Sequence, residues 1–118
     1  MKLEGEGVLV RIFVSESDRY KGVPLYEALV QRAREIGLAG ATVYRGFEGF
    51  GAHNLVRSAR ILCLSEDLPM VVEIVDRKDK IDAFLPELDR MVPEGMVTLE
   101  TVQVILYRMR DEAGTHTH

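Results

Sequence analysis

The stretch Val8-Leu-Val-Arg-Ile-Phe-Val14 decides the fold of this chain. Aliphatic β-branched and aromatic residues dominate it, which is typical of a β-strand. Because side chains alternate across a strand, the four valine and isoleucine residues at even positions share one face, and Leu9, Arg11 and Phe13 share the other. Both faces are apolar apart from one arginine. We therefore expect a strand inside a sheet that helices cover on one side only.

Outward from this strand, the apolar pattern predicts five more elements. In chain order they are a helix between Pro24 and Gly37, strands at 41–44 and 70–75, a helix at 81–91 and a strand at 97–107. Pro24 suits the first turn of a helix, and Gly37 is a natural stop. Pro86 lies inside the second predicted helix, where it predicts a kink or a break.

The order β-α-β-β-α-β predicts an α+β fold, the ferredoxin-like βαββαβ sandwich, with an antiparallel sheet and two helices on one face. Residues 1–110 form a single expected domain, and 111–118 a frayed C-terminal tail. The segment 46–68 is long for a hairpin connection, and such a loop is usually functional. The alternative fold is another α+β sandwich in which the run Ile61–Leu64 forms an extra strand.

Length and composition limit the classes of function. The 118 residues suit one domain, and a net charge of −4 with a pI of about 5.4 argues against a nucleic-acid-binding role. One Cys excludes an internal disulfide, and we find neither a signal-peptide core nor an apolar run of about 20 residues, so a cytoplasmic location is expected. One Asn and two Gln beside eleven Arg and twelve Glu fit a thermophilic source, or equally a GC-rich genome.

The second face of the sheet is apolar with one polar residue per strand, which is typical of an interface. We predict a homo-oligomer that buries it, with an ion pair between Arg11 and Glu73 on adjacent strands. The alternative is a mixed surface on which both charges are solvated. The predicted interface residues are Leu9, Arg11, Phe13, Val71, Glu73 and Ile105.

Residues for catalysis or metal binding are few. Cys63 lies in an apolar run, where a Cys is usually a small core residue, and His53 is the only His inside the expected domain. We therefore predict no catalytic residue and no metal site.

The glycine-rich stretch Gly46-Phe-Glu-Gly-Phe-Gly51 is either an anion-binding loop or a flexible turn. Arg108 and Arg110 would project on one side of a continuing last strand and could hold a phosphate there.

Several motifs occur here in a familiar order. Gly37-Leu-Ala-Gly-Ala-Thr-Val43, Gly49-Phe-Gly51 and Leu68-Pro-Met-Val-Val-Glu-Ile-Val75 together resemble the PII signal-transduction proteins. A second set resembles more closely the PII-like family known as domain of unknown function 190, over residues 7 to 108. That set comprises Ser15–Gly22, Pro24–Ala28, Ala39–Gly46 and Leu64–Pro69.

The resemblance implies a PII-like homotrimer with adenine-nucleotide sites in the clefts between subunits. It also implies a non-enzymatic signalling role, in which the T-loop-like segment 46–68 reports to a partner protein or a membrane transporter. The ligand-binding residues that it implies are Arg45, Gly46, Gly49, Phe50, Gly51, His53, Arg108 and Arg110.

This sequence departs from the PII pattern at the phosphate-binding positions. The turn Val92–Met96 holds no cation, and Met70 stands where PII proteins have a Lys. We therefore expect AMP or ADP as the ligand in preference to ATP, and no other cofactor. The segment 51–68 has no Tyr, which excludes uridylylation there. Two alternatives are a divalent-metal-binding trimer resembling the copper-tolerance proteins and a small ferredoxin-like enzyme.

Overall fold

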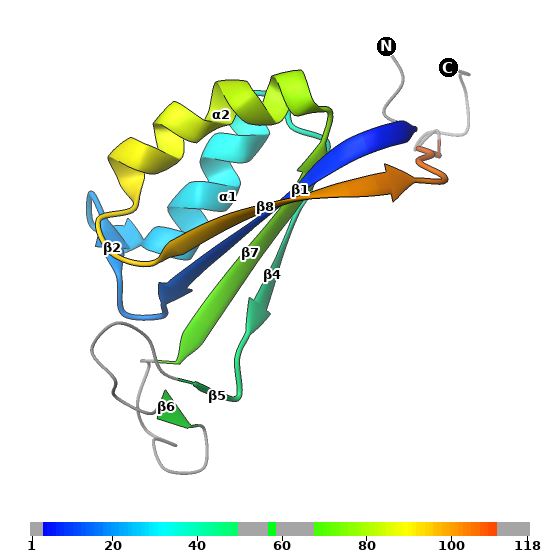
Figure 1. The fold of residues 1–118 in the computed structure, drawn as a ribbon. Coiled ribbons are helices and arrows are strands. Elements are labelled where there is room, and N and C mark those ends of the chain that lie inside the picture. The colour runs from blue at the N-terminus through cyan, green and yellow to red at the C-terminus, as the bar shows by residue number, and fades with distance from the viewer. Residues whose placement is uncertain (1–3, 50–56, 59–67, 111–118) are drawn as a thin grey trace.

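Four strands form one antiparallel sheet in the computed structural model, which describes residues 4–49, 57–58 and 68–110 (Figure 1). The spatial order β4-β7-β1-β8 places the first and third main strands in the centre, so the predicted ferredoxin-like arrangement is confirmed. The four strands are β1 (Gly5–Ser15), β4 (Ala41–Arg45), β7 (Pro69–Asp76) and β8 (Met96–Val104). Two short hairpins pair β2 (Arg19–Tyr20) with β3 (Val23–Pro24), and β5 (Glu48–Gly49) with β6 (Arg57–Ser58).

Two helices, α1 (Leu25–Glu35) and α2 (Lys78–Met91), cover the same face of the sheet (Figure 1). Pro24 precedes α1 as its N-cap. Gly37 follows the helix end with a φ of +83°, and Leu38 N–H donates to the Ala33 carbonyl at 3.0 Å, which satisfies one of the last carbonyl groups of α1. The sequence thus marks both ends of this helix correctly.

Pro86 does not break the second helix, because α2 continues through it to Met91. The missing N–H of Pro86 would have bonded the carbonyl of Asp82. Both residues lie on the exposed side of α2, where water can bond that carbonyl instead. The predicted break is therefore wrong.

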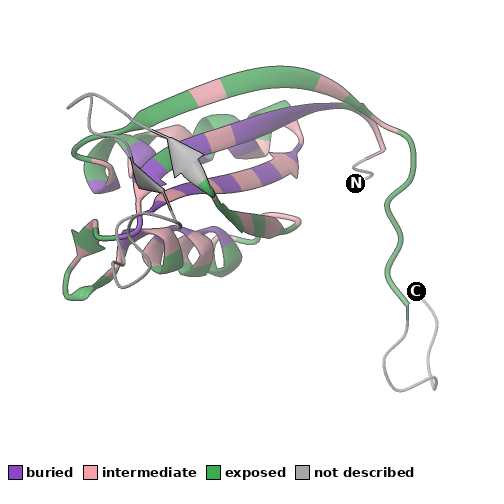
Figure 2. Cartoon of the chain, turned by 90° about the horizontal axis from the view of Figure 1, so that it is seen from below, coloured by how far each residue is buried: buried purple, intermediate pink, exposed green. Residues whose placement is uncertain are grey.

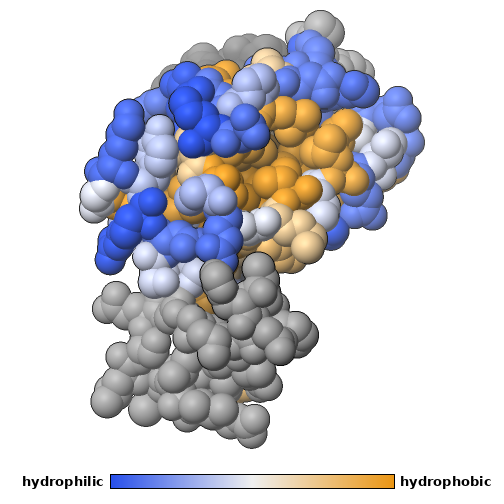
Figure 3. Space-filling model, turned by 60° about the vertical axis from the view of Figure 1, so that its left-hand side comes forward, coloured by the Kyte–Doolittle hydropathy of each residue, from blue (hydrophilic) through white to orange (hydrophobic). Residues whose placement is uncertain are grey.

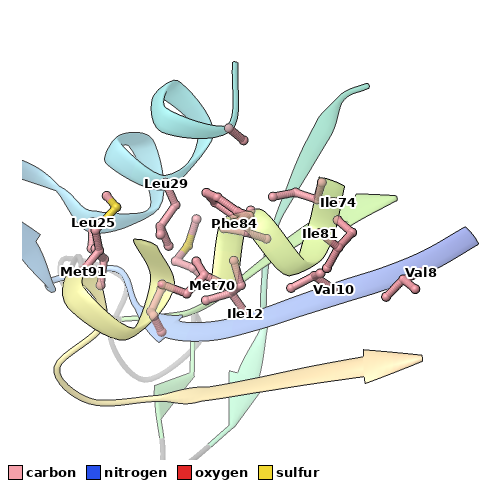
Figure 4. Packing of buried hydrophobic residues seen from close by; sticks show 14 residues of the cluster. Val8, Val10, Ile12, Leu25, Leu29, Met70, Ile74, Ile81, Phe84 and Met91 are labelled. Carbon is pink, nitrogen blue, oxygen red and sulfur yellow. The ribbon is translucent and has the colours of Figure 1, made fainter. Parts of the chain in front are cut away.

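The hydrophobic core fills the space between the helices and the covered face of the sheet. The even-numbered side chains of β1 and β7 point toward apolar side chains of α1 and α2 (Figure 4). Its largest fully buried side chains are Phe84, Ile12, Leu25, Leu29, Ile74, Ile81, Val10 and Val72. Burying an aliphatic or aromatic side chain of this size contributes about 1.5–3 kcal/mol, so this layer is the main source of stability.

An ion pair joins the two helices on their outer side. Arg32 donates to both carboxylate oxygens of Glu87, at 3.0 and 2.8 Å, and Arg90 donates to the same carboxylate. The hydrogen bonds from Arg32 and Arg90 lower the pKa of Glu87 to about 2. Bidentate arginine–carboxylate contacts have a fixed geometry, so this pair helps to fix the position of α1 relative to α2.

The other face of the sheet, which we call the open face, has no helix on it among the residues that the structure describes (Figure 1). The register of the strands assigns alternate residues of each strand to it. Apart from Gly5, Gly7, Ser15 and Pro69 at the strand ends, they are Leu9, Arg11 and Phe13 of β1, Val71, Glu73 and Val75 of β7, Thr42 and Tyr44 of β4, and Met96, Thr98, Glu100, Val102 and Val104 of β8. More than half of these are apolar or aromatic.

β8 differs from the central strands in its exposure. Most of its residues are exposed, whereas buried residues recur along β1 and β7 (Figure 2). Met96 is 60% exposed on the open face, and Leu99 is 50% exposed on the opposite face, because the helices do not reach over this flanking strand. Apolar side chains gather in a patch on the side of the molecule drawn in Figure 3, and hydrophilic side chains frame that patch.

The register corrects one part of the sequence analysis. Ile105 is predicted on the open face, which would place Gln103 there as well because side chains alternate, but Gln103 pairs with Glu6 and lies on the helix side, whereas Val102 and Val104 lie on the open face. β8 also ends at Val104, because that residue pairs with Gly5, the first residue of β1. Ile105 therefore lies beyond the strand and not among the open-face residues of the sheet.

Candidate functional site

Three of the predicted ligand-binding residues lie where the segment 46–68 leaves the sheet. Arg45 ends β4, Gly46 follows it, and Gly49 belongs to the short strand β5. Phe50, Gly51 and His53 lie outside the described residues, as does the run Ile61–Leu64 of the alternative fold.

Gly46 is held tightly at this junction. Its N–H donates to the carbonyl of Pro69, the first residue of β7, at 2.6 Å. A Cβ at Gly46 would lie 2.8 Å from Cγ and 3.2 Å from the carbonyl oxygen of Pro69, so no larger residue fits without displacing the proline. The backbones at the end of β4 and the start of β7 therefore approach each other at Gly46.

Arg45 forms an ion pair that the sequence analysis missed. Its Nη2 donates to a carboxylate oxygen of Glu16, whose side chain is only 8% exposed. The other carboxylate oxygen accepts Leu68 N–H at 3.4 Å, and Glu16 N–H donates to the Leu68 carbonyl at 2.7 Å. Glu16 thus connects the end of β1 to both sides of the junction.

The signal for Glu16 in the sequence is slight. It stands in the polar stretch Ser15-Glu-Ser-Asp18, which predicts a turn, and a turn carboxylate is ordinarily solvated. Asp18 does have the ordinary turn role, since its side chain accepts Ser15 N–H at 2.9 Å. Only the tertiary fold, which places Arg45 and Leu68 beside residue 16, distinguishes the two acids.

The two C-terminal arginines lie at the opposite end of the sheet. Beyond Val104 the chain is tied to other elements by Tyr107, whose N–H donates to Glu4 at 2.9 Å and whose hydroxyl donates to the Ala39 carbonyl at 3.2 Å. Arg108 and Arg110 follow it and are exposed. Because β8 has already ended, the expectation that they project on one side of a continuing strand is wrong.

One chain therefore does not bring the predicted ligand-binding residues together. Ser15 pairs with Pro69 at one end of β1, and Gly5 pairs with Val104 at the other. The eleven residues of β1 span about 33 Å at roughly 3.3 Å per residue, so the junction lies at one end of a long sheet and the segment that leads to Arg108 and Arg110 at the other (Figure 1).

The predicted ion pair on the open face is confirmed. Arg11 Nε donates to Glu73 Oε2 at 2.8 Å, and Arg11 Nη1 donates to Glu100 Oε1 at 3.0 Å. The hydrogen bonds that Arg11 donates, first to Glu73 and then to Glu100, raise the pKa of its guanidinium. Glu73 lies on β7 and Glu100 on β8, and the arginine thus links three neighbouring strands.

A hollow of about 760 Å³ lies on the helix side, between the β2–β3 hairpin, α1 and the end of α2. Tyr20, Tyr26 and Val30 contribute to its wall, with Lys21 and Arg90. The sequence analysis did not predict it. No group of three or more His, Cys, Asp or Glu residues able to hold a metal ion occurs within 4–49, 57–58 and 68–110.

Comparison with known proteins identifies the family. The chain matches the family model DUF190, described as "Uncharacterized ACR", over residues 7–104. The chain belongs to the DUF190 family. Among relatives, a UPF0166 protein of Aquifex aeolicus is 44% identical over 97 residues, which cover 82% of this chain and 91% of that protein. A UPF0166 protein of Methanocaldococcus jannaschii is 32% identical over 93 residues, covering 79% and 85% of the two chains.

Solved structures show that this DUF190 protein has the PII-like fold. CPII, a nitrogen regulatory PII-like protein from Thiomonas intermedia bound to ADP, AMP and bicarbonate, aligns with a TM-score of 0.62 at 15% identity, covering 88% of this chain and 99% of CPII. A putative PII-like signaling protein from Thermus thermophilus aligns with a TM-score of 0.63 at 22% identity, covering 89% and 94%.

The divalent ion tolerance protein CutA1 from Ehrlichia chaffeensis also resembles this DUF190 protein in fold. It aligns with a TM-score of 0.55 at 7% identity, covering 92% of this chain and 89% of CutA1. At such identities the likeness concerns the fold and not the ligand. Among the helices in the described part of the DUF190 chain, none is long and apolar enough to cross a membrane.

Proposed function

We propose that this DUF190 protein is a non-enzymatic regulatory protein of the PII-like type, which acts as a homotrimer in the cytoplasm. In this proposal it binds an adenine nucleotide, AMP or ADP, in the clefts between subunits. It reports the occupied state to a partner protein or transporter through the segment 46–68. The observation that supports the proposal best is the open face, on which Arg11 bonds both Glu73 and Glu100.

The open face supports assembly because most of its side chains are apolar and neither α1 nor α2 covers it. Phe13 is 38% exposed and Tyr44 51% exposed on this face. Large exposed apolar surfaces of this kind usually mark interfaces. Arg11 is paired with Glu73 and Glu100 within one subunit, so a second copy can cover the guanidinium without leaving it unpaired, and the cluster keeps one net negative charge.

The separation of the arginines supports a site between subunits. Arg45 and Gly46 lie at one end of the sheet, and Arg108 and Arg110 at the other, so a single subunit cannot bring all four to one phosphate group. In an oligomer the junction of one subunit and the C-terminal end of its neighbour can meet. The bound ADP and AMP of the similarly folded CPII suggest the class of ligand for such a cleft.

The test combines assembly and binding in one preparation. Native mass spectrometry is expected to give a trimer, and calorimetry is expected to show binding of AMP or ADP, with ATP and cyclic AMP as comparisons. Charge-assisted hydrogen bonds to phosphate contribute about 1.5–3 kcal/mol, so the Arg108→Ala/Arg110→Ala variant should bind at least about tenfold more weakly and remain trimeric.

Two results would contradict this function. A stable monomer at micromolar concentration would exclude sites between subunits, and an intact trimer that binds none of the four nucleotides would exclude nucleotide sensing.

Because the fold also resembles CutA1, a divalent-metal-binding trimer is the second candidate. Metal analysis after dialysis against copper and zinc separates the two candidates, and we expect no stoichiometric metal.

A further inference from the structure

A nearly buried carboxylate lies at the junction of β4 and β7. Glu16 is only 8% exposed. An ionised carboxylate with so little exposure needs a cation or hydrogen-bond donors around it. Arg45 supplies the cation and Leu68 N–H supplies a donor. The backbone of Glu16 adds a third link, because its N–H donates to the Leu68 carbonyl at 2.7 Å.

The two members of this ion pair differ in their access to solvent. The Arg45 side chain is 59% exposed, whereas Glu16 is almost entirely covered. A guanidinium carries five N–H donors in a fixed plane, and Nη2 is the atom that contacts Glu16. An anion arriving from solvent can therefore reach Arg45 but not Glu16.

We propose that Glu16 is the resident counter-ion of Arg45 and that an anionic ligand must compete with it for the guanidinium. This inference rests on the proposed function, in which Arg45 belongs to the nucleotide-binding set. When a phosphate group takes over Arg45, Glu16 keeps Leu68 N–H and loses its cation. Ligand binding at Arg45 thereby removes the side-chain contact that ties the end of β1 to the end of β4.

The first experiment measures the affinity for AMP and ADP by calorimetry at constant salt. Glu16→Gln keeps an amide oxygen that can accept Leu68 N–H but removes the charge that competes for Arg45. It is expected to bind about three- to tenfold more tightly than the wild type. Arg45→Gln is expected to bind at least about tenfold more weakly. Unchanged or weaker binding by Glu16→Gln would overturn the inference.

Glu87→Gln is the matched control. It removes another little-exposed carboxylate that is paired with an arginine, but on the helix layer and away from the junction. Its affinity for both nucleotides should equal that of the wild type. Equal gains in Glu16→Gln and Glu87→Gln would point to a general effect of net charge and would also overturn the inference.

The second experiment needs no ligand and follows hydrogen exchange of Leu68 N–H and Glu16 N–H. Both Glu16→Gln and Arg45→Gln should speed this exchange, and the double variant should exchange no faster than either single variant. If wild-type protein binds neither nucleotide, the proposed function fails and this experiment decides about Glu16 separately. An unchanged Leu68 rate in Glu16→Gln would then refute the counter-ion role, and raised, non-additive rates would support it.

Discussion

The two faces of the sheet are built from alternate residues of the same strands, yet they are completed in different ways. On the helix side, Val10, Ile12 and Val72 have no exposed surface, because α1 and α2 cover them. On the open face Leu9 is buried but most other apolar side chains stay partly exposed, and Arg11 links three strands through Glu73 and Glu100. The comparison teaches that the described part of the chain completes only one of the two apolar layers of its sheet.

Two phenylalanines on opposite faces give the largest expected contrast. Phe84 is fully buried in the helix layer, and Phe13 is 38% exposed on the open face. In dilute protein, Phe84→Ala should lower the free energy of unfolding by about 3–5 kcal/mol, because it leaves a cavity in the core. Phe13→Ala should cost about 1 kcal/mol under the same conditions.

Urea unfolding of both variants checks this contrast, and repeating it at high protein concentration sharpens it. If the open face is shared between copies, the loss caused by Phe13→Ala should grow with concentration, whereas the loss caused by Phe84→Ala should not. Equal losses in dilute protein would show that the chain itself already buries both faces.

The entry into β8 gives the next largest effect. Gly95 has a φ of +146°, and a Cβ there would lie 2.4 Å from the carbonyl oxygen of Phe13. Gly95→Ala should therefore cost about 1–3 kcal/mol, since both the backbone conformation and the contact with β1 are strained.

Gly40 provides the matched control for Gly95, because a Cβ at Gly40 meets nothing within 4 Å. Gly40→Ala should leave the thermal midpoint unchanged or raise it slightly. If Gly95→Ala were as neutral as Gly40→Ala, β8 would not be fixed against β1 at its start, and the open face would be less well ordered than the helix side.

The smallest expected effect concerns the helix layer in acid. Arg32 and Arg90 lower the pKa of Glu87 from 4.5 to about 2, so the unfolded chain binds a proton more readily than the folded one. The stability from this carboxylate is complete above pH 4.5 and is lost as the pH falls toward 2. Thermal midpoints of wild type and Glu87→Gln should therefore converge across this range, and a constant difference between them would contradict the assigned cause.

The sequence predicts those parts of the fold that depend on local pattern. Alternation in Val8–Val14 assigns Arg11 and Phe13 to the open face correctly, and the pairing of Arg11 with Glu73 follows from the strand order. Gly37 marks the end of α1 because a positive φ favours glycine. For the strand alternation and the helix end, neighbouring residues carry the signal, whereas the ion pair follows only once the strand order of the fold is assigned.

The features that the sequence does not predict depend on pairing between distant segments. β8 ends at Val104 because β1 begins at Gly5, and nothing near residue 104 marks that limit. The same register places Val102, and not Gln103, on the open face. Glu16 becomes a buried carboxylate only when Arg45 and Leu68 are brought to it. The sequence therefore names Arg45, whose role in ligand binding stays a prediction, but it does not mark the carboxylate that pairs with it.

The pairing of Gly5 with Val104 has a practical consequence for anyone who wishes to attach a reporter to this protein. The described chain begins and finishes at one end of the sheet, remote from Arg45 and Glu16 (Figure 1). A fluorophore attached at either end of the described residues lies on the side of Arg108 and Arg110. Energy transfer between a donor there and an acceptor dye near β5 would report the distance between the two ends of the sheet.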